Sequence, residues 1–344
     1  MNACLVIGTN SYGGAVRVAR FVYDILIDMK FNVTVINVYS EGDGFFNDIE
    51  HENLNFVAGQ FVKPLFKFKK YFSKNQFDLI LGFGGYMNLL IALTNPKAKL
   101  IISEHSNHIA YFHFLYKPLI FLAYKRADFI TFLTKFDYDF YKIKKSQVML
   151  NPFFVNISED KFEKENIILF PSSIDTRKRL DFLINAFSTI DESLRKSYKI
   201  IACGDGSERE KCEKLAIEKG VNLEILGFTK DIDKFYKKAK IVALTSWSEG
   251  LPLILIEAIY FDCARISTDC ISGPRELIED GIDGFLCNLN DESEFAKKLE
   301  ILMSDEKLRL EFCQKARERK SEFDPKTVYK KWKNLIQKVM NKDI

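Results

Sequence analysis

Short apolar runs alternate with segments of helical periodicity along the first half of the chain. Each run has the composition of a buried strand, and each helical segment is long enough to return the chain to the start of the next strand. The alternation begins again after Asn151. The runs are CLVIG, NVTVINV, LNFVA, DLILGF and KLIISE, then NIILF, YKIIACG, NLEILGF, IVALTS and CARIST. This pattern predicts an α/β protein with two Rossmann-like sheets in tandem.

The length of the chain fits two domains, because 344 residues can bury two separate cores. We place an N-terminal domain at residues 1–155 and a C-terminal domain at 156–325. The segment 327–340 is expected to be one amphipathic helix that packs its apolar face on the body of the protein. Its apolar positions are Val328, Trp332, Leu335, Ile336 and Val339.

The composition is that of a globular protein, with 47% hydrophobic and 28% charged residues. Seven cysteines without CxxC spacing favour reduced thiols in a cytosol, and the first residues lack the features of a secretory signal. Charge is uneven, since residues 1–157 hold 17 Lys and Arg against 12 Asp and Glu, and the remainder holds 33 against 35. The basic first half favours an anionic acceptor or a membrane surface, or it is a solvated face.

Three glycine turns follow predicted strands and suit close approach of the backbone to a ligand. Gly13-Gly14 precedes the first helix, 204–206 reads GDG, and 226–228 reads LGF. Ser207 and Glu210 resemble a capping box at the start of the next helix. Each turn is also compatible with a plain connection between strand and helix.

The strongest chemical signal is a pair of carboxylates eight positions apart, Glu249 and Glu257, in SEGLPLILIEA. Glu249 lies in the loop before an apolar helix and is suited to accept hydrogen bonds from sugar hydroxyls. Glu257 would reach a ribose from the helix itself. The backbone amides at the amino end of this helix are suited to a diphosphate.

These motifs together resemble glycosyltransferase family 4. Within it, SEHSN at 103–107 and the run from Glu257 to Ser267 resemble bacterial transferases that extend undecaprenyl-diphosphate-linked glycans with N-acetylgalactosamine. The resemblance implies a GT-B fold with an interdomain cleft, and a last segment, 326–344, that returns to the N-terminal domain. It also implies retaining transfer of a hexose or N-acetylhexosamine from a UDP-sugar, with no metal and no cofactor. The expected acceptor is a lipid-linked or surface-glycan saccharide.

The resemblance also assigns site residues. The catalytic group would be His105 against the donor sugar, Glu249 on its hydroxyls and Lys178 on the diphosphate. It also assigns Glu257 to the ribose. With the glycine turns, the loop before the apolar helix and nearby basic residues added, the predicted donor-binding positions are Gly14, Arg17, Ser173, Arg177, Gly204, Leu226, Phe228, Leu251, Pro252, Leu253 and Glu257. For His105, a hydrogen-bonded histidine at a strand end is the alternative.

The chain departs from the family at two places. Ser172 and Ser173 stand where the family has Gly-Arg, and Val16 stands where many relatives have Glu. Arg177 or Arg17 is expected to supply the missing charge, because a serine cannot offer the bidentate contact of a guanidinium.

The segment 61–74 is the cleanest amphipathic helix, with phenylalanines on one side and lysines on the other. Lys63, Lys67 and Lys70 are predicted to hold an acceptor diphosphate or anionic headgroups, helped by the aromatic segment 109–124. The alternative is a solvated lysine face. We therefore expect a cytoplasmic protein, peripheral to the inner membrane, with no nucleic-acid partner.

Two other functions fit the same residues. One is a catalytically silent regulator or scaffold that binds UDP-sugar, which the serine at position 173 favours. The other is a UDP-sugar epimerase on the same fold; a phosphorylase would need a pyridoxal-phosphate lysine, which nothing in the sequence marks.

Overall fold

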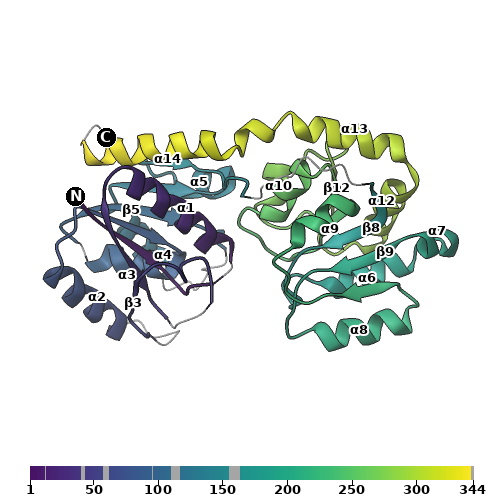
Figure 1. Ribbon diagram of the computed structural model, residues 1–344, viewed down its shortest axis with the longest axis horizontal. Helices are drawn as coiled ribbons and strands as arrows, with labels where there is room; N and C mark the ends of the chain where they lie inside the picture. Colours follow the sequence, from purple (N-terminus) through teal and green to yellow (C-terminus); the bar gives the residue numbers. More distant parts are fainter. Residues whose placement is uncertain are drawn as a thin grey trace. The chain divides into compact units, whose positions relative to one another are not determined.

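The computed structural model describes residues 1–11, 13–39, 43–56, 62–94, 96–109, 117–154 and 163–341, and only the backbone of Val62 and Lys117. The chain divides into two compact units (Figure 1). The N-terminal unit comprises Met1–Pro152 and Pro325–Ile344, and the C-terminal unit comprises Phe153–Asp324. The break after Pro152 lies close to the boundary that the sequence predicts at residue 155.

The N-terminal unit is built on a seven-stranded sheet of order β3-β2-β1-β4-β5-β6-β7. Neighbouring strands are all parallel. Helices cover both faces of such a sheet, which explains why its strands read as continuous apolar runs. The strands are β1 (Asn2–Ile7), β2 (Asn32–Asn37), β3 (His51–Asn53), β4 (Leu79–Phe83), β5 (Lys99–Glu104), β6 (Phe129–Phe132) and β7 (Ser146–Val148).

The helices of this unit pack in two groups. The helix α2 contacts α3, and α3 contacts α4, whereas α14 lies along α1 (Figure 1). The predicted apolar face of α14 is buried, and its Trp332 ring lies 6.1 Å from that of Phe83. The helices are α1 (Gly14–Asp28), α2 (Val62–Lys74), α3 (Gly85–Thr94), α4 (Lys117–Tyr124), α5 (Lys135–Tyr141) and α14 (Pro325–Met340).

The C-terminal unit is built on a six-stranded parallel sheet of order β10-β9-β8-β11-β12-β13. Its strands are β8 (Glu165–Phe170), β9 (Lys199–Ala202), β10 (Leu223–Ile225), β11 (Ala239–Leu244), β12 (Ala264–Thr268) and β13 (Phe285–Cys287). Its helices are α6 (Leu180–Ser188), α7 (Glu192–Ser197), α8 (Arg209–Glu218), α9 (Ile232–Lys238), α10 (Leu253–Tyr260), α11 (Pro274–Leu277), α12 (Glu292–Ser304), α13 (Glu306–Arg317) and the 3-10 turn η1 (Lys320–Glu322).

One predicted strand is wrong. The run LNFVA forms no strand at 54–56, and its last two residues lie outside the described ones; the strand is β3, just before it. The apolar side chain of Phe56 is buried, and its ring lies 5.4 Å from that of Phe68. The N–H groups of Leu54 and Phe56 donate to the carbonyl oxygens of Asn37 and Val38 at 2.9 Å each, so the run continues beside β2 after β3 has ended. The strands β6, β7 and β13 were not expected from the sequence.

All seven cysteines lie among the described residues, where they are buried and form no disulfide. Within the described ranges, every helix is too short or too polar to cross a membrane.

Candidate active site

The chemistry-bearing residues of the C-terminal unit gather at the carboxyl edge of its sheet. Lys178 follows β8, and Glu249 follows the neighbouring strand β11. Strand order reverses between these two strands, because the chain moves from β8 outward to β10 and then returns to the other side of β8. A reversal of this kind opens a crevice at which α/β proteins bind ligands.

An ion pair lies at this edge of the sheet. The Lys178 Nζ lies 2.5 Å from Oε1 of Glu249, and Arg177 Nη1 lies 3.7 Å from the same oxygen. The two side chains of the close pair are largely buried, with exposed fractions of 14% and 9%, whereas Arg177 is exposed. Buried charges need partners, and each member of this pair supplies one to the other. Three predicted residues, Lys178, Arg177 and Glu249, are thereby brought together.

The loop that carries Lys178 is held by Asp175, which the sequence reasoning missed. Its Oδ1 accepts from the backbone N–H groups of Arg177 and Lys178 at 2.9 Å each, and its Oδ2 accepts from Ser173 Oγ at 2.8 Å. Burial raises the pKa of Asp175, but these hydrogen bonds and Arg177 outweigh it and lower the pKa below its usual value. The spacing S-x-D is a turn signal that was available in the sequence. The Ser173 hydroxyl therefore donates its hydrogen bond within the loop itself.

A second turn packs on the backbone around Glu249. Ser272 and Gly273 both have positive φ, 67° and 87°. A Cβ on Gly273 would lie 2.5 Å from the carbonyl oxygen of Gly250 and 2.9 Å from Cδ of Pro252. Only glycine fits this approach, so the turn fixes the loop that presents Glu249.

The helix α10 begins directly after this loop, as the sequence predicts. Pro252 is its N-cap residue, Leu251 is buried just before it, and Leu253 is its first residue. Glu257 lies within the helix, is 8% exposed, and accepts a hydrogen bond from Tyr236 Oη at 2.6 Å. The amino end of α10 and both carboxylates thus belong to one loop and helix.

The glycines of the GDG turn have a steric role. A Cβ on Gly204 would lie 2.0 Å from the carbonyl oxygen of Ser172, and one on Gly206 would lie 2.2 Å from that of Ile174. The predicted capping box is wrong, because α8 begins at Arg209 and its N-cap residue Glu208 makes no side-chain capping bond. The Glu208 N–H instead donates to the Ile174 carbonyl at 3.0 Å, so the backbone here joins the two loops.

The LGF turn presents apolar side chains at the same edge of the sheet. Gly227 has a φ of 72°, which favours glycine. Phe228 is 61% exposed and Leu226 is 36% exposed. The turn therefore places an exposed aromatic ring after β10.

The other predicted donor residues belong to the N-terminal unit. Gly13 is the N-cap residue of α1, and Gly14 is exposed at its first position. Arg17, in the first turn of this helix, lies over the ring of Phe45 at 5.8 Å. His105 follows β5.

His105 is held through a short hydrogen-bond relay. Thr131 Oγ1 donates to Ser103 Oγ at 2.9 Å, and Ser103 Oγ lies 2.9 Å from Nε2 of His105. With the Ser103 proton directed to Nε2, the ring proton lies on Nδ1. Burial lowers the pKa of His105 to about 4, so the ring is neutral near pH 7 and acts as a hydrogen-bonding group.

The neighbouring Glu104 makes the stability of this unit depend on pH. Burial raises its pKa to about 7 from 4.5, although Asn88 Nδ2 donates to its Oε1 at 2.7 Å. The folded state therefore keeps a proton that the unfolded state loses, and stability falls as pH rises from about 4.5 to 7. Glu104→Gln should remove up to about 3 kcal/mol of this loss.

Urea denaturation of Glu104→Gln between pH 5 and 8 tests this expectation. The variant should lose less stability than the parent over that range. Glu50→Gln, at an exposed loop position, is the matched control. Its free energy of unfolding should change with pH as that of the parent does. If the free energy of unfolding changes with pH equally in all three proteins, Glu104 does not titrate in this range.

The three lysines predicted for the acceptor are all exposed on α2. Lys67 Nζ lies 3.5 Å from the carbonyl oxygen of Leu54 and 5.2 Å from the centre of the Phe56 ring. Phe66, between Lys63 and Lys70, is 66% exposed. Residue 61, the first of the predicted amphipathic segment, lies outside the described residues.

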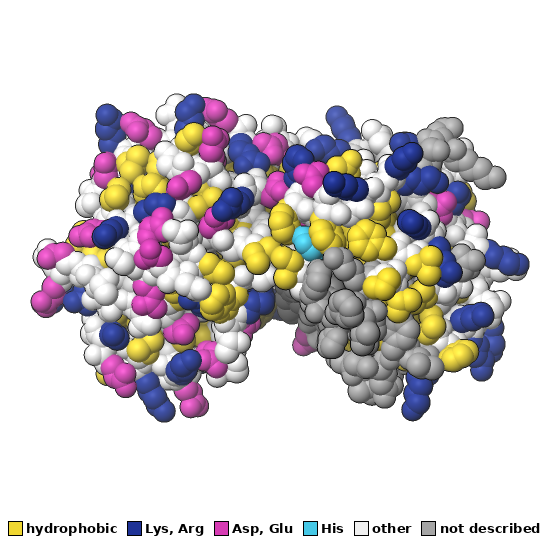
Figure 2. Space-filling model, turned by 180° about the vertical axis from the view of Figure 1, so that it is seen from behind, with side chains coloured by type: hydrophobic (Ala, Val, Ile, Leu, Met, Phe, Trp, Pro, Cys, Tyr) yellow, Lys and Arg dark blue, Asp and Glu magenta, His cyan; other side chains and the backbone are white. Residues whose placement is uncertain are grey.

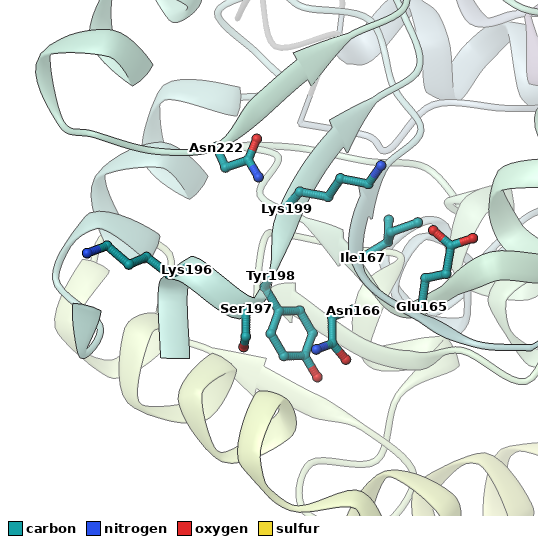
Figure 3. A pocket seen from close by; sticks show the side chains of 8 residues that line it. All are labelled: Glu165, Asn166, Ile167, Lys196, Ser197, Tyr198, Lys199 and Asn222. Carbon is teal, nitrogen blue, oxygen red and sulfur yellow. The ribbon is translucent and has the colours of Figure 1, made fainter. Parts of the chain in front are cut away.

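A shallow cavity of about 220 Å³ lies at the opposite edge of the C-terminal sheet (Figure 3). Glu165 and Lys199, which line it, are the first residues of β8 and β9. The cavity is therefore at the amino ends of the strands, away from Lys178 and Glu249, and it does not belong to the candidate site.

Comparison with known proteins identifies the family. Residues 155–319 match the model of the family described as Glycosyl transferases group 1. The chain is 31% identical, over 99% of both chains, to a Campylobacter jejuni enzyme named GalNAc-alpha-(1->4)-GalNAc-alpha-(1->3)-diNAcBac-PP-undecaprenol alpha-1,4-N-acetyl-D-galactosaminyltransferase. It is 26% identical to the amylovoran biosynthesis glycosyltransferase AmsD of Erwinia amylovora, over 96% of this chain and 98% of that one. The chain belongs to the group 1 glycosyltransferases, which confirms the predicted family.

Solved structures confirm the fold. HepE of Anabaena in complex with UDP superposes with a TM-score of 0.80 at 17% identity, over 98% of this chain and 100% of that chain. A sucrose-phosphate synthase from Thermosynechococcus elongatus superposes with a TM-score of 0.79 at 16% identity, over 99% and 100%. The two-sheet α/β architecture is thus the GT-B fold.

Proposed function

We propose that the protein transfers an N-acetylhexosamine or hexose from a UDP-sugar to a lipid-linked saccharide, with retention of anomeric configuration and without a metal. The observation that carries this proposal is the pair of Lys178 and Glu249 at the strand-order reversal, next to the amino end of α10. A diphosphate needs fixed positive charge, and a sugar needs a fixed acceptor of hydroxyl hydrogen bonds. The pair offers the positive charge and the hydrogen-bond acceptor at one edge of the sheet.

Each group has a distinct task in this proposal. Negative charge grows on UDP as the glycosidic bond breaks, and the Lys178 ammonium would stabilise it together with the backbone N–H groups of α10. Arg177, which lies beside the pair, would supply the charge that Ser173 cannot. Glu249 would orient the sugar, Glu257 would bind the ribose, and the neutral His105 would contact the donor sugar.

Retention follows from the chemistry of the proposed substrates. Donors such as UDP-N-acetylgalactosamine carry an α-linked diphosphate, and the relative from Campylobacter jejuni is named for an α-linked product. A transfer of the same kind by this chain would keep the configuration.

The acceptor side of the proposal rests on positive charge in the N-terminal unit. With the lysine-rich α14 included, this unit holds 23 Lys and Arg against 13 Asp and Glu. Figure 2 shows Lys and Arg side chains spread over its visible face. The lysines of α2, with the exposed Phe66 among them, suit a diphosphate or anionic headgroups at a membrane surface. The proposed location is the cytoplasmic face of the inner membrane.

The direct test incubates the purified protein with UDP-N-acetylgalactosamine and an undecaprenyl-diphosphate-linked saccharide, with and without EDTA. UDP release, a mass increase of one sugar and an α-anomeric proton in the product are expected in both. If the protein binds UDP-sugar but releases no UDP with any acceptor, the result would favour a regulator. Conversion of the UDP-sugar without acceptor would favour an epimerase.

A triple variant tests the lysines of α2. Replacing Lys63, Lys67 and Lys70 with Gln should raise the acceptor KM at least tenfold and leave UDP affinity unchanged, because each surface lysine contributes about 1 kcal/mol toward an anionic partner. The matched control replaces Lys326, Lys330 and Lys331, exposed on α14 of the same unit, and changes net charge equally. Equal effects of the two triples would contradict a specific role for α2. If the α2 triple variant loses activity on acceptor in vesicles but not on a soluble diphosphate acceptor, then α2 binds the bilayer.

A further inference from the structure

Tyr236 is buried beneath the proposed ribose-binding carboxylate. It is 0% exposed, and its hydroxyl donates to Oε2 of Glu257 at 2.6 Å. A carboxylate can only accept, so the tyrosine must be the donor. Hydrogen bonds to an ionised group are short and strong, and this distance is that of such a bond.

The tyrosine is itself held by two further contacts, one to its ring and one to its carbonyl oxygen. Its ring stacks on Phe261 with centroids 5.2 Å apart and an angle of 15°. The Lys164 ammonium, reaching from the start of β8, donates to the carbonyl oxygens of Tyr236, Ala239 and Phe261 at 3.0, 2.8 and 2.7 Å. These carbonyls lie at the ends of α9 and α10, where a cation is favoured. One lysine therefore ties together the helix that carries Tyr236 and the helix that carries Glu257.

The hydroxyl remains a donor at all ordinary pH values. Burial, together with the charge of Glu257, raises the pKa of Tyr236 well above its usual value. A carboxylate has about four acceptor positions, so the bond from Tyr236 is compatible with acceptance from a ribose.

We propose that Tyr236 is a positioning residue for nucleotide binding: it fixes the Glu257 carboxylate in the orientation that accepts the ribose hydroxyls. This rests on the proposed function, in which Glu257 binds the ribose. A preorganised acceptor binds a ligand without first losing rotamer freedom, so the tyrosine contributes affinity without touching the nucleotide.

The test compares Tyr236→Phe with the parent protein by calorimetry, using UDP and 2′,3′-dideoxy-UDP, which lacks the ribose hydroxyls. The substitution removes only the hydroxyl and retains the ring and the Lys164 contacts. Affinity for UDP should fall about fivefold to tenfold, whereas affinity for dideoxy-UDP should stay within about twofold. In a Glu257→Gln background, Tyr236→Phe should have little further effect on UDP affinity.

A matched control separates positioning from general destabilisation. Tyr198→Phe removes another buried hydroxyl of the same unit, which donates to the Met303 carbonyl at 2.9 Å. It should lower thermal stability without changing the ratio of the two affinities. If Tyr236→Phe does not fold, Phe261→Leu removes the stacked ring and should shift the ratio in the same direction.

The outcomes separate the two levels of the proposal. If the parent binds UDP and dideoxy-UDP equally, the ribose role of Glu257 is wrong. If the parent discriminates and Tyr236→Phe discriminates equally well, or weakens both ligands alike, the positioning role of Tyr236 is overturned while Glu257 keeps its assignment.

Discussion

Replacing Lys178 with methionine is expected to lower turnover by about a hundredfold to a thousandfold, the usual effect of losing one preorganised contact to developing charge. The methionine retains most of the apolar stem, so the loss reports the ammonium. Arg177 is 3.7 Å from the same carboxylate, so Glu249 keeps a cationic neighbour and the fold should survive. The measurement is UDP release under saturating donor, with circular dichroism to verify folding.

Lys234→Met is the matched control for this experiment. Lys234 forms an exposed ion pair with Asp231 at 2.7 Å on α9 of the same unit. An exposed pair of this kind contributes about 1 kcal/mol or less, and its loss should leave turnover unchanged. Near-parental turnover of Lys178→Met would remove this lysine from the site, and an equal loss in both variants would point to a general effect of charge.

The fold could largely be predicted because its signal is local. Buried parallel strands and the helices between them each leave a periodicity of their own, and glycines mark the ends of several strands. The prediction that Glu249 precedes a helix and Glu257 lies on it needed only that periodicity. The run LNFVA misplaced the strand by a few residues, because its start directly follows β3, bonds to the end of β2 and packs Phe56 on Phe68.

The contacts that hold the candidate site together are not local. Lys178 and Glu249 are 71 residues apart, and Tyr236 and Glu257 are 21 apart, so no periodicity connects them. The capping box failed for the same reason, since the backbone before α8 donates to a loop after β8. The resemblance to a family named several of these residues, but it could not show that Ser173 donates to Asp175.

Arg265, which the sequence singled out only as part of a run resembling relatives, supports the site from within the core. It is 0% exposed, and its Nη2 lies 2.9 Å from Oδ2 of Asp283. Its Nη1 donates to the carbonyl oxygen of Leu277 at 2.7 Å, at the end of α11. This helix follows the turn at Gly273 that packs on Gly250, so the arginine links the core to the loop of Glu249.

Arg265→Met should therefore lower the free energy of unfolding by about 3–5 kcal/mol, because it leaves the buried charge of Asp283 without its partner. The double variant Arg265→Met with Asp283→Asn should recover much of that loss, since no buried charge then remains unpaired. Arg275→Met is the control, because its ion pair with Asp269 has a 75% exposed arginine and should cost about 1 kcal/mol or less. Urea denaturation measures all three. If Arg265→Met is as stable as the Arg275 control, water reaches Asp283. If the double variant is no more stable than Arg265→Met, the loss comes from the hydrogen bond with Leu277 and not from the charge.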